Sequence, residues 1–434
     1  MRFEKASRWG LLAVTLSLAG CEGGKDPLLH PAPKETVHFG TITVSETWRA
    51  ADNPHVVRGI VYVRGAGSPV LTVEPGVQVR FESESSLTIG DGVGGVGTLK
   101  AEGTAEAPIL FTSDSDEPQP GDWYGITLMG SAALGASLSH VTVEYGGAPL
   151  PEFASVPEMA PYLSASLRVS ELAPTTEDVR TVRVRDVVVQ QSLNQGVLLS
   201  GAGFTEDSAR LVVRDNAGAA LSVSANNVGS LPADSRFSGN TDDVVRILTG
   251  TVQNTQTWPM VGVPYRFADL HGLGLTGVTV GAASSPVLTL SPGTEFQMPE
   301  TGIVRVGAFD ENGSRVPGAI HAVGTAEAPI RFVPVSATAP RGSWAGLQFM
   351  SETGSTLEHV TITHGGRPYA TATGGNLTLL TPANLTLRNV TLSESSGCGL
   401  VMALPGETRF PDYTEASLQN VFTNNDSGAQ CNNP

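Results

Sequence analysis

SPVLTVEPG (68–76), GTAEAPI (103–109), GDWYGITLM (121–129) and LSHVTVEYGG (138–147) occur in this order, and all four recur as SPVLTLSPG (285–293), GTAEAPI (324–330), GSWAGLQFM (342–350) and LEHVTITHGG (357–366). The offset between each segment and its second copy is nearly constant. Self-similarity at a fixed spacing indicates a repeat architecture. We therefore expect two tandem homologous units, residues 37–245 and residues 246–434, the second closed by a C-terminal cap.

The segments in and around these repeats predict strands. Short runs of Val, Leu, Ile, Thr and Phe, such as VLTVEPGVQVRF and ANLTLRNVTL, alternate with Gly, Pro, Asn, Asp and Ser. The chain has 50 glycines and 29 prolines, which exclude long helices. The predicted fold class is all-β.

A recurring bend motif selects a solenoid among the all-β folds. An apolar residue, a spacer, then His, Asp or Asn, then Val occurs five times, with the polar residue at His140, Asp186, His359, Asn389 and Asn420. A parallel β-helix stacks coils and repeats one polar residue at the same bend, where such residues tolerate an unusual backbone. Positions 140 and 186 are 46 residues apart (186 − 140), which we interpret as two turns of about 23 residues.

The same segments carry a family resemblance. LTVEPGVQVRF, GTLKAEGTAEAPILFTS, GDWYGITL and LSHVTVEYGG resemble the right-handed parallel β-helix (pectin-lyase-like) surface lipoproteins of myxobacteria and related bacteria. The resemblance implies a right-handed parallel β-helix solenoid over nearly the whole mature chain. It does not imply one activity, because this superfamily includes polysaccharide lyases and hydrolases as well as non-catalytic adhesins and scaffolds.

The N-terminus resembles a lipoprotein signal. Arg2, Lys5 and Arg8 precede a short apolar run, which ends in Leu18-Ala19-Gly20-Cys21. We expect a signal peptide at residues 1–20, lipidation (palmitate) at Cys21 and a flexible tether over residues 21–36. The alternative is an ordinary secretory signal with a chance cysteine. Glu22 stands where an aspartate would favour inner-membrane retention, so we expect an outer-membrane lipoprotein, at the periplasmic face or the cell surface, with the lipid bilayer as its first partner.

Net charge and cysteine content limit the expected partners and the expected state of the thiols. The formal net charge is −16, and an acidic surface repels phosphate backbones, so nucleic acid is not an expected partner. Cys398 and Cys431 remain besides Cys21. Outside the reducing cytoplasm an even remainder suggests a disulfide. Two free thiols are the alternative.

Few residues suggest a site. Trp123, Trp344 and Phe153 are weak candidates for ligand binding, although the matched places of the two tryptophans in the two units favour packing. Asp114, Asp116 and Asp122 are weak candidates for Ca²⁺, against the alternative of a solvated acidic loop. His140 and His359 belong to the bend series and are poor candidates for catalysis. We expect no cofactor apart from this calcium option.

No local constellation of acids and bases marks a catalytic centre. We therefore predict a lipid-anchored, non-catalytic β-helix for adhesion, or for binding cell-surface or matrix glycans or proteins. The alternatives are a polysaccharide lyase or glycoside hydrolase of the same fold and a structural cell-envelope protein. The proline-rich loop at residues 148–161, the largest difference between the units, is either a binding loop or a lid over an irregular coil.

Overall fold

A computed structural model describes residues 35–91, 94–151, 159–171, 179–268, 276–310, 312–368, 374–382, 384–404, 406–407 and 409–433. Residues 35–434 form one compact unit. In the described part, strands dominate and the only α-helix is α1 (Ala160–Leu163). None of the helical segments described is long and apolar enough to cross a membrane.

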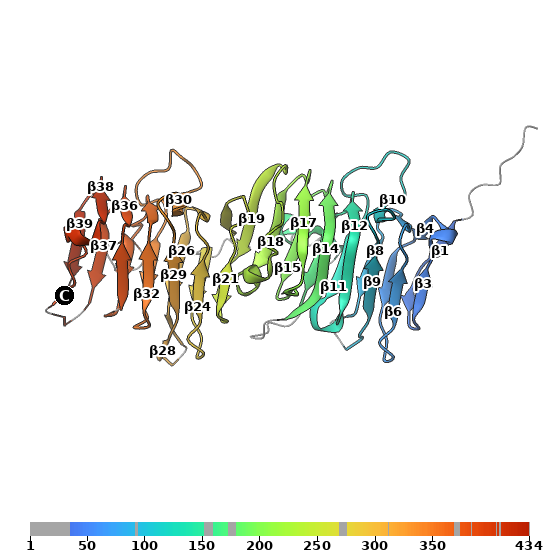
Figure 1. Cartoon of the computed structure of the whole chain (residues 1–434), viewed down its shortest axis with the longest axis horizontal. Helices are drawn as coiled ribbons and strands as arrows, with labels where there is room; N and C mark the ends of the chain where they lie inside the picture. Colours follow the sequence, from blue (N-terminus) through green and yellow to red (C-terminus); the bar gives the residue numbers. More distant parts are fainter. Residues whose placement is uncertain are drawn as a thin grey trace, which may run out of the picture. The chain divides into compact units, whose positions relative to one another are not determined.

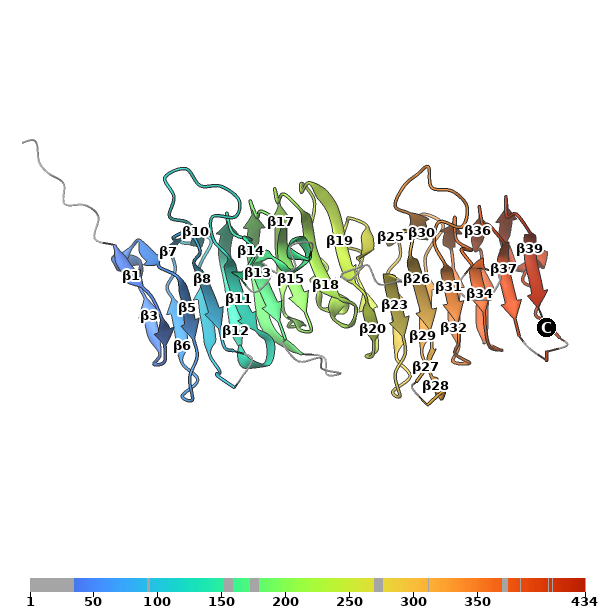
Figure 2. The same ribbon diagram turned by 180° about the vertical axis from the view of Figure 1, so that it is seen from behind.

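The strands coil around a shared core and pair with their counterparts in the next coil (Figures 1 and 2). Every ladder between described strands is parallel except the small hairpin of β27 (Ala308–Phe309) and β28 (Arg315–Val316). This pattern is a parallel β-helix, so the predicted all-β solenoid is confirmed.

Four sheets make up the solenoid. An 11-stranded sheet is confined to the first half of the chain and consists of β1 (Thr36–His38), β3 (Glu46–Trp48), β4 (His55–Val57), β6 (Val70–Val73), β7 (Gln78–Phe81), β9 (Thr98–Glu102), β10 (Ile109–Ser113), β12 (Ala136–Glu144), β14 (Arg180–Gln190), β16 (Gly203–Phe204) and β17 (Ala209–Arg214). A 14-stranded sheet runs through both halves and consists of β2 (Thr41–Ile42), β5 (Ile60–Val63), β8 (Ser86–Ile89), β11 (Gly125–Met129), β13 (Ala165–Ser170), β15 (Gln195–Ser200), β18 (Ala219–Ser224), β19 (Asp242–Leu248), β22 (Tyr265–Ala268), β25 (Glu295–Met298), β30 (Ile330–Pro334), β33 (Val360–Thr363), β36 (Thr391–Ser393) and β38 (Val421–Thr423).

The second half adds two further sheets. One has seven strands, β20 (Gly250–Val252), β23 (Thr276–Val280), β26 (Gly302–Val306), β31 (Gly346–Phe349), β34 (Gly375–Leu379), β37 (Cys398–Ala403) and β39 (Gly428–Asn433). The other has five, β21 (Gln256–Trp258), β24 (Val287–Leu290), β29 (Ala319–Val323), β32 (Ser355–Glu358) and β35 (Leu385–Arg388).

Strands that match by sequence in the two copies lie in different sheets. By sequence, β7 (VQVRF) matches β25 (TEFQM), and β11 (GITLM) matches β31 (GLQFM). However, β7 lies in the 11-stranded sheet and β25 in the 14-stranded sheet, while β11 lies in the 14-stranded sheet and β31 in the seven-stranded one. Strands β18, β19 and β22 pair in succession across the predicted seam near residue 245. The 14-stranded sheet therefore changes from one class of strand to another at the seam.

Inward side chains form one continuous hydrophobic core. Alternate residues of β6 and β7 are buried, as a strand with one face on the core requires. Apolar residues stack on apolar residues in successive coils, for example Val79 on Phe111 and Phe111 on Val143. Burying each such side chain contributes roughly 1.5–3 kcal/mol before the cost of ordering the chain.

One coil is larger than expected. Strand β12 pairs directly with β14, with Leu138 opposite Val184, 46 residues later (184 − 138). Among the described strands, only β13 lies between these two along the chain, and the direct pairing of β12 with β14 makes the span one turn, so our interpretation of it as two shorter turns is wrong. The connections on either side of β13 take up the extra length. The described end of the 148–161 loop leads into α1, where Tyr162 packs on Ala165 and Leu198 of the 14-stranded sheet.

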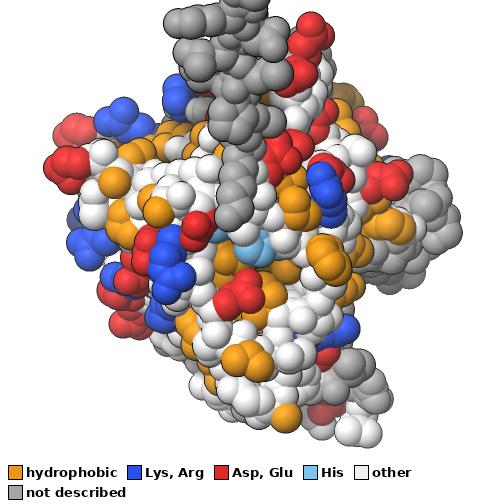
Figure 3. All heavy atoms as spheres, turned by 90° about the vertical axis from the view of Figure 1, so that its right-hand side faces the viewer, with side chains coloured by type: hydrophobic (Ala, Val, Ile, Leu, Met, Phe, Trp, Pro, Cys, Tyr) orange, Lys and Arg blue, Asp and Glu red, His pale blue; other side chains and the backbone are white. Residues whose placement is uncertain are grey.

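The two ends of the stack differ. At the N-terminal end β1, β2 and β3 are the last strands of their sheets, and Phe39 and Val44 beside them are 77% and 74% exposed. Figure 3 views this end, where histidine and hydrophobic surface is visible. At the C-terminal end, Gln430 and Asn432 pair with Leu400 and Met402 of the preceding coil. The last coil therefore places polar residues over apolar ones.

Candidate functional site

Several sequence predictions concern residues outside the described part of the chain. These are the signal peptide at residues 1–20, Cys21, the tether as far as residue 34, and Phe153. They remain predictions.

The tryptophans are packing residues. Trp123 and Trp344 are fully buried. The indole N–H of Trp123 donates to the Glu144 carbonyl at 2.9 Å, and that of Trp344 donates to the Thr363 carbonyl at 2.7 Å. Trp123 also stacks on Phe81 with ring centroids 3.8 Å apart. Neither ring is available to stack on a sugar, so the binding interpretation of these two residues is wrong.

The three aspartates do not converge on a common point. Asp122 accepts hydrogen bonds from the Ser113 hydroxyl at 2.5 Å and the Gln119 backbone N–H at 3.0 Å, while Asp116 is exposed. Burial, followed by the nearby Glu35 carboxylate, raises the pKa of Asp114. Over the described residues, no group of three or more His, Cys, Asp or Glu side chains could hold a metal ion.

The polar residues of the bend series are explained by their backbone conformation. His140, Asp186, His359 and Asn389 have φ values between 47° and 54°, the left-handed region that Asn, Asp and His tolerate. The fifth prediction is off by one residue, because Gln419 has φ 56°. Asn420 instead uses its side chain, which accepts from Val390 N–H at 3.0 Å and donates to backbone carbonyls. No metal or catalytic role is needed to explain these residues.

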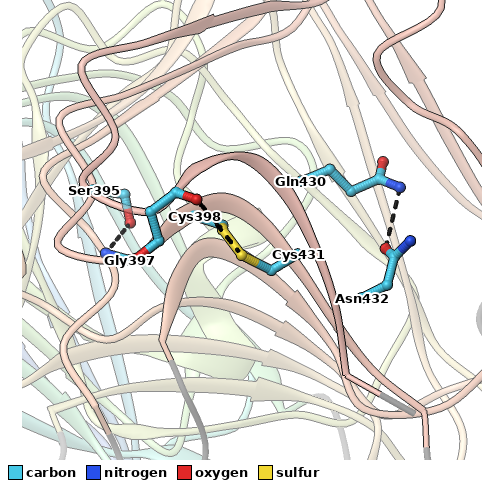
Figure 4. The surroundings of a disulfide bond; sticks show 7 residues. Ser395, Gly397, Cys398, Gln430, Cys431 and Asn432 are labelled. Atoms are coloured by element: carbon cyan, nitrogen blue, oxygen red, sulfur yellow. Dashed lines mark hydrogen bonds between the residues drawn. A yellow bond between two sulfur atoms is a disulfide. The ribbon is translucent and has the colours of Figure 1, made fainter.

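Cys398 and Cys431 form a disulfide between β37 and β39 (Figure 4). Their Cα atoms are 5.9 Å apart, and 33 residues separate them in sequence. The bond ties the polar last coil to the apolar coil beneath it.

A groove on the outer surface of β14 and β17 is the strongest candidate for a binding site. Its volume is about 760 Å³, and its lining combines apolar residues with charged ones: Asp186, Val188, Arg210, Val212, Arg214, Asp234, Arg236 and Ser238. Val188 and Val212 are opposite each other in neighbouring strands, and Arg236 continues this row. The floor is thus two valines, with guanidinium groups around them.

Hydrogen bonds occupy the carboxylates of the groove. Arg210 donates from Nε and Nη2 to both oxygens of Asp186, at 2.5 and 2.6 Å, and its backbone N–H donates to Asp234 at 2.9 Å. The Arg210 hydrogen bonds lower the pKa of Asp186. Asp186 is therefore a persistent anion and a poor proton donor, which favours a binding surface over acid catalysis at this place.

Two arginines of the groove keep donors for a ligand. Among the described residues, the side chain of Arg214 forms a single ion pair, at 3.6 Å with exposed Asp215, and Arg236 is exposed at the end of the valine row. Guanidinium groups bind carboxylate and other anionic oxygens in a bidentate manner. Sequence reasoning missed this site, although VRVRDVVVQ (182–190) and RLVVRDN (210–216) contain its signal: arginines at outward positions beside buried valines.

Comparison with known proteins identifies the same fold in part of the chain. Residues 40–150 match the family model of a pectate-lyase like beta helix domain. No curated protein and no solved structure matches the chain.

Proposed function

We propose that this chain is a lipid-anchored, non-catalytic β-helix that binds an extended polymer, a surface glycan or a protein segment, in the groove on β14 and β17. The observation that carries the proposal is the lining itself, with two valines as the floor and Arg214 and Arg236 as donors not occupied by strong ion pairs. The groove lies on paired strands of a sheet, so its donors are held at fixed intervals by the ladder.

The anchor and location are part of the same proposal. The apolar run and Leu18-Ala19-Gly20-Cys21 support lipidation at Cys21, and Glu22 supports the outer membrane. A lipid at the N-terminus would hold the solenoid at the membrane surface, where it could contact matrix or neighbouring cells. Cys21→Ser should shift the protein from the membrane fraction to the soluble fraction. An unchanged distribution would contradict the lipid anchor and leave the proposed groove binding unaffected.

Binding to an array of glycans and of surface proteins tests the groove. The double variant Arg214→Ala/Arg236→Ala should weaken binding of each hit by about two- to thirtyfold, since each exposed charged contact contributes about 0.2–1 kcal/mol. The same ligand should dissociate more readily at high salt. Arg388→Ala removes an exposed arginine from β35 and is the matched control. Equal binding by all variants would place the ligand elsewhere.

The match to a pectate-lyase like domain favours one alternative, a polysaccharide lyase. Each glycan hit should therefore be incubated with and without Ca²⁺ while the absorbance of unsaturated products is followed. Binding without product supports the proposal. Product formation would replace it with the lyase, and a protein that binds nothing on either array would favour a structural role in the envelope.

A further inference from the structure

The second copy has a cavity that the proposed function does not use. Its volume is about 730 Å³, and it lies where β25 and β30 end, next to residues 335–343. Apolar side chains form most of its lining (Met298, Pro299, Pro334, Val335, Ala339 and Pro340). Glu300, Ser336, Thr338, Ser343 and Arg367 supply the polar groups.

The strand ladder and the buried tryptophan position this lining. Met298 pairs with Pro334, and the Val335 N–H donates to the Met298 carbonyl at 3.1 Å. On the other side, the Arg367 N–H donates to the carbonyl of buried Trp344 at 2.9 Å. Arg367 Nη1 then donates to the Glu300 carbonyl at 2.8 Å, which fixes the guanidinium beside the cavity.

The first copy shows that the fold does not require these residues. Matching the repeats by sequence places Glu82 at the position of Pro299, Asp114 at that of Val335 and Ala148 at that of Arg367. Two acids of the first copy are thus replaced by apolar residues and an alanine by a cation, while Glu300 of the second copy stands where the first has Ser83. Both copies bury the tryptophan of this corner, so the changed residues lie around a retained core residue, and we interpret the change of surface chemistry as a sign of a ligand.

We infer that this cavity binds a small amphipathic anion, an apolar chain that ends in one carboxylate. The volume falls in the range of small-molecule sites, which are mostly apolar with few polar groups. Arg367 is the only cation of the lining, and its guanidinium forms no ion pair with any described carboxylate. The lining contains no aromatic side chain on which a sugar ring could stack.

Glu300 provides a test of sign. Its carboxylate is exposed at the same rim and should repel an anionic head group. Removal of the cation and removal of the anion are thus expected to change the affinity in opposite directions.

Titration calorimetry with decanoate and with decyltrimethylammonium, both below micelle-forming concentrations, tests the inference on the full protein. We expect one decanoate per chain and tighter binding of decanoate than of the ammonium amphiphile. Arg367→Ala should weaken decanoate by up to about fivefold and Glu300→Gln should strengthen it by a smaller factor. Octanoate, which is two methylenes shorter, should bind about fifteenfold more weakly than decanoate, because each buried methylene contributes about fourfold.

Two further variants locate the site. Val335→Asp introduces the residue of the first copy and should abolish decanoate binding, whereas Arg388→Ala and the groove variant Arg214→Ala/Arg236→Ala should leave it unchanged. Far-ultraviolet circular dichroism establishes that each variant is folded. Absence of decanoate binding, preference for the ammonium amphiphile, or equal loss in Arg388→Ala would overturn the inference without affecting the groove.

Discussion

The bend at His359 allows one substitution to be tested at two positions with opposite expected signs. His359 has φ 48°, whereas His321 in the middle of β29 lies in an extended strand. An L-residue in the left-handed region costs roughly 1–2 kcal/mol, which glycine avoids. Glycine also adds about 0.4–1 kcal/mol of unfolded-state entropy. His359→Gly should therefore range from neutral to about 1.5 kcal/mol more stable.

At His321 the same change removes a side chain from a strand and relieves no strain. His321→Gly should destabilise by roughly 1 kcal/mol, so the two variants should differ by about 1–2.5 kcal/mol. His359→Val is the third member of the series and should destabilise by more than about 1 kcal/mol, because a β-branched residue tolerates this backbone poorly.

Urea unfolding followed by circular dichroism measures the overall change. Hydrogen exchange measures the local change in stability at two amides. One is the Ile330 N–H, which donates to the His359 carbonyl, and the other is the His359 N–H itself. If His359→Gly were destabilised as much as His321→Gly, the imidazole would contribute an interaction of its own, and our explanation of the bend by backbone preference would be refuted.

Three further changes probe packing, the C-terminal coil and pH. Burial, with a smaller effect of neighbouring His55, lowers the pKa of His38 from 6.5 to about 4. As the pH falls, the unfolded chain therefore binds a proton at His38 before the folded chain does. The free energy of unfolding should fall by about 1–3 kcal/mol as pH drops from 6.5 to 4. Denaturant titrations at each pH measure this loss, which His38→Leu should reduce. Replacing both Cys398 and Cys431 by Ser should cost about 3–4 kcal/mol from the 33-residue separation, measured as a lower urea midpoint; an unchanged midpoint would mean that the bond adds nothing. Trp344→Phe should cost about 1–3 kcal/mol through the lost hydrogen bond and ring volume, with the thermal midpoint as the measurement and no change as the contrary result.

Local sequence patterns were sufficient for the fold class. Alternation such as VLTV predicts which residues point inward, and the structure buries them accordingly. The polar bend residues at positions 140, 186, 359 and 389 carry the expected backbone. These features depend on neighbours in the chain, which a single sequence displays.

Non-local features were not predictable in the same way. Alternation does not say which sheet a strand joins, so the changed partners of β25 and β31 came only from the structure. The spacing between His140 and Asp186 fitted two short turns as well as one long turn, because length alone does not reveal an excursion. The groove could not be predicted for the same reason, because its lining residues come together from successive coils. Val188 of β14, for example, lies opposite Val212 of β17.

The change of partner strands at the seam has a consequence for the surface that the repeated segments can present. Had the second copy continued every sheet in phase, the chain would display one longer stripe of repeated side chains, suited to a periodic ligand along its length. Here the 14-stranded sheet presents one class of strand before the seam and another after it. Each copy contributes a different surface to that sheet, so neither surface needed its twin to keep a shared binding register.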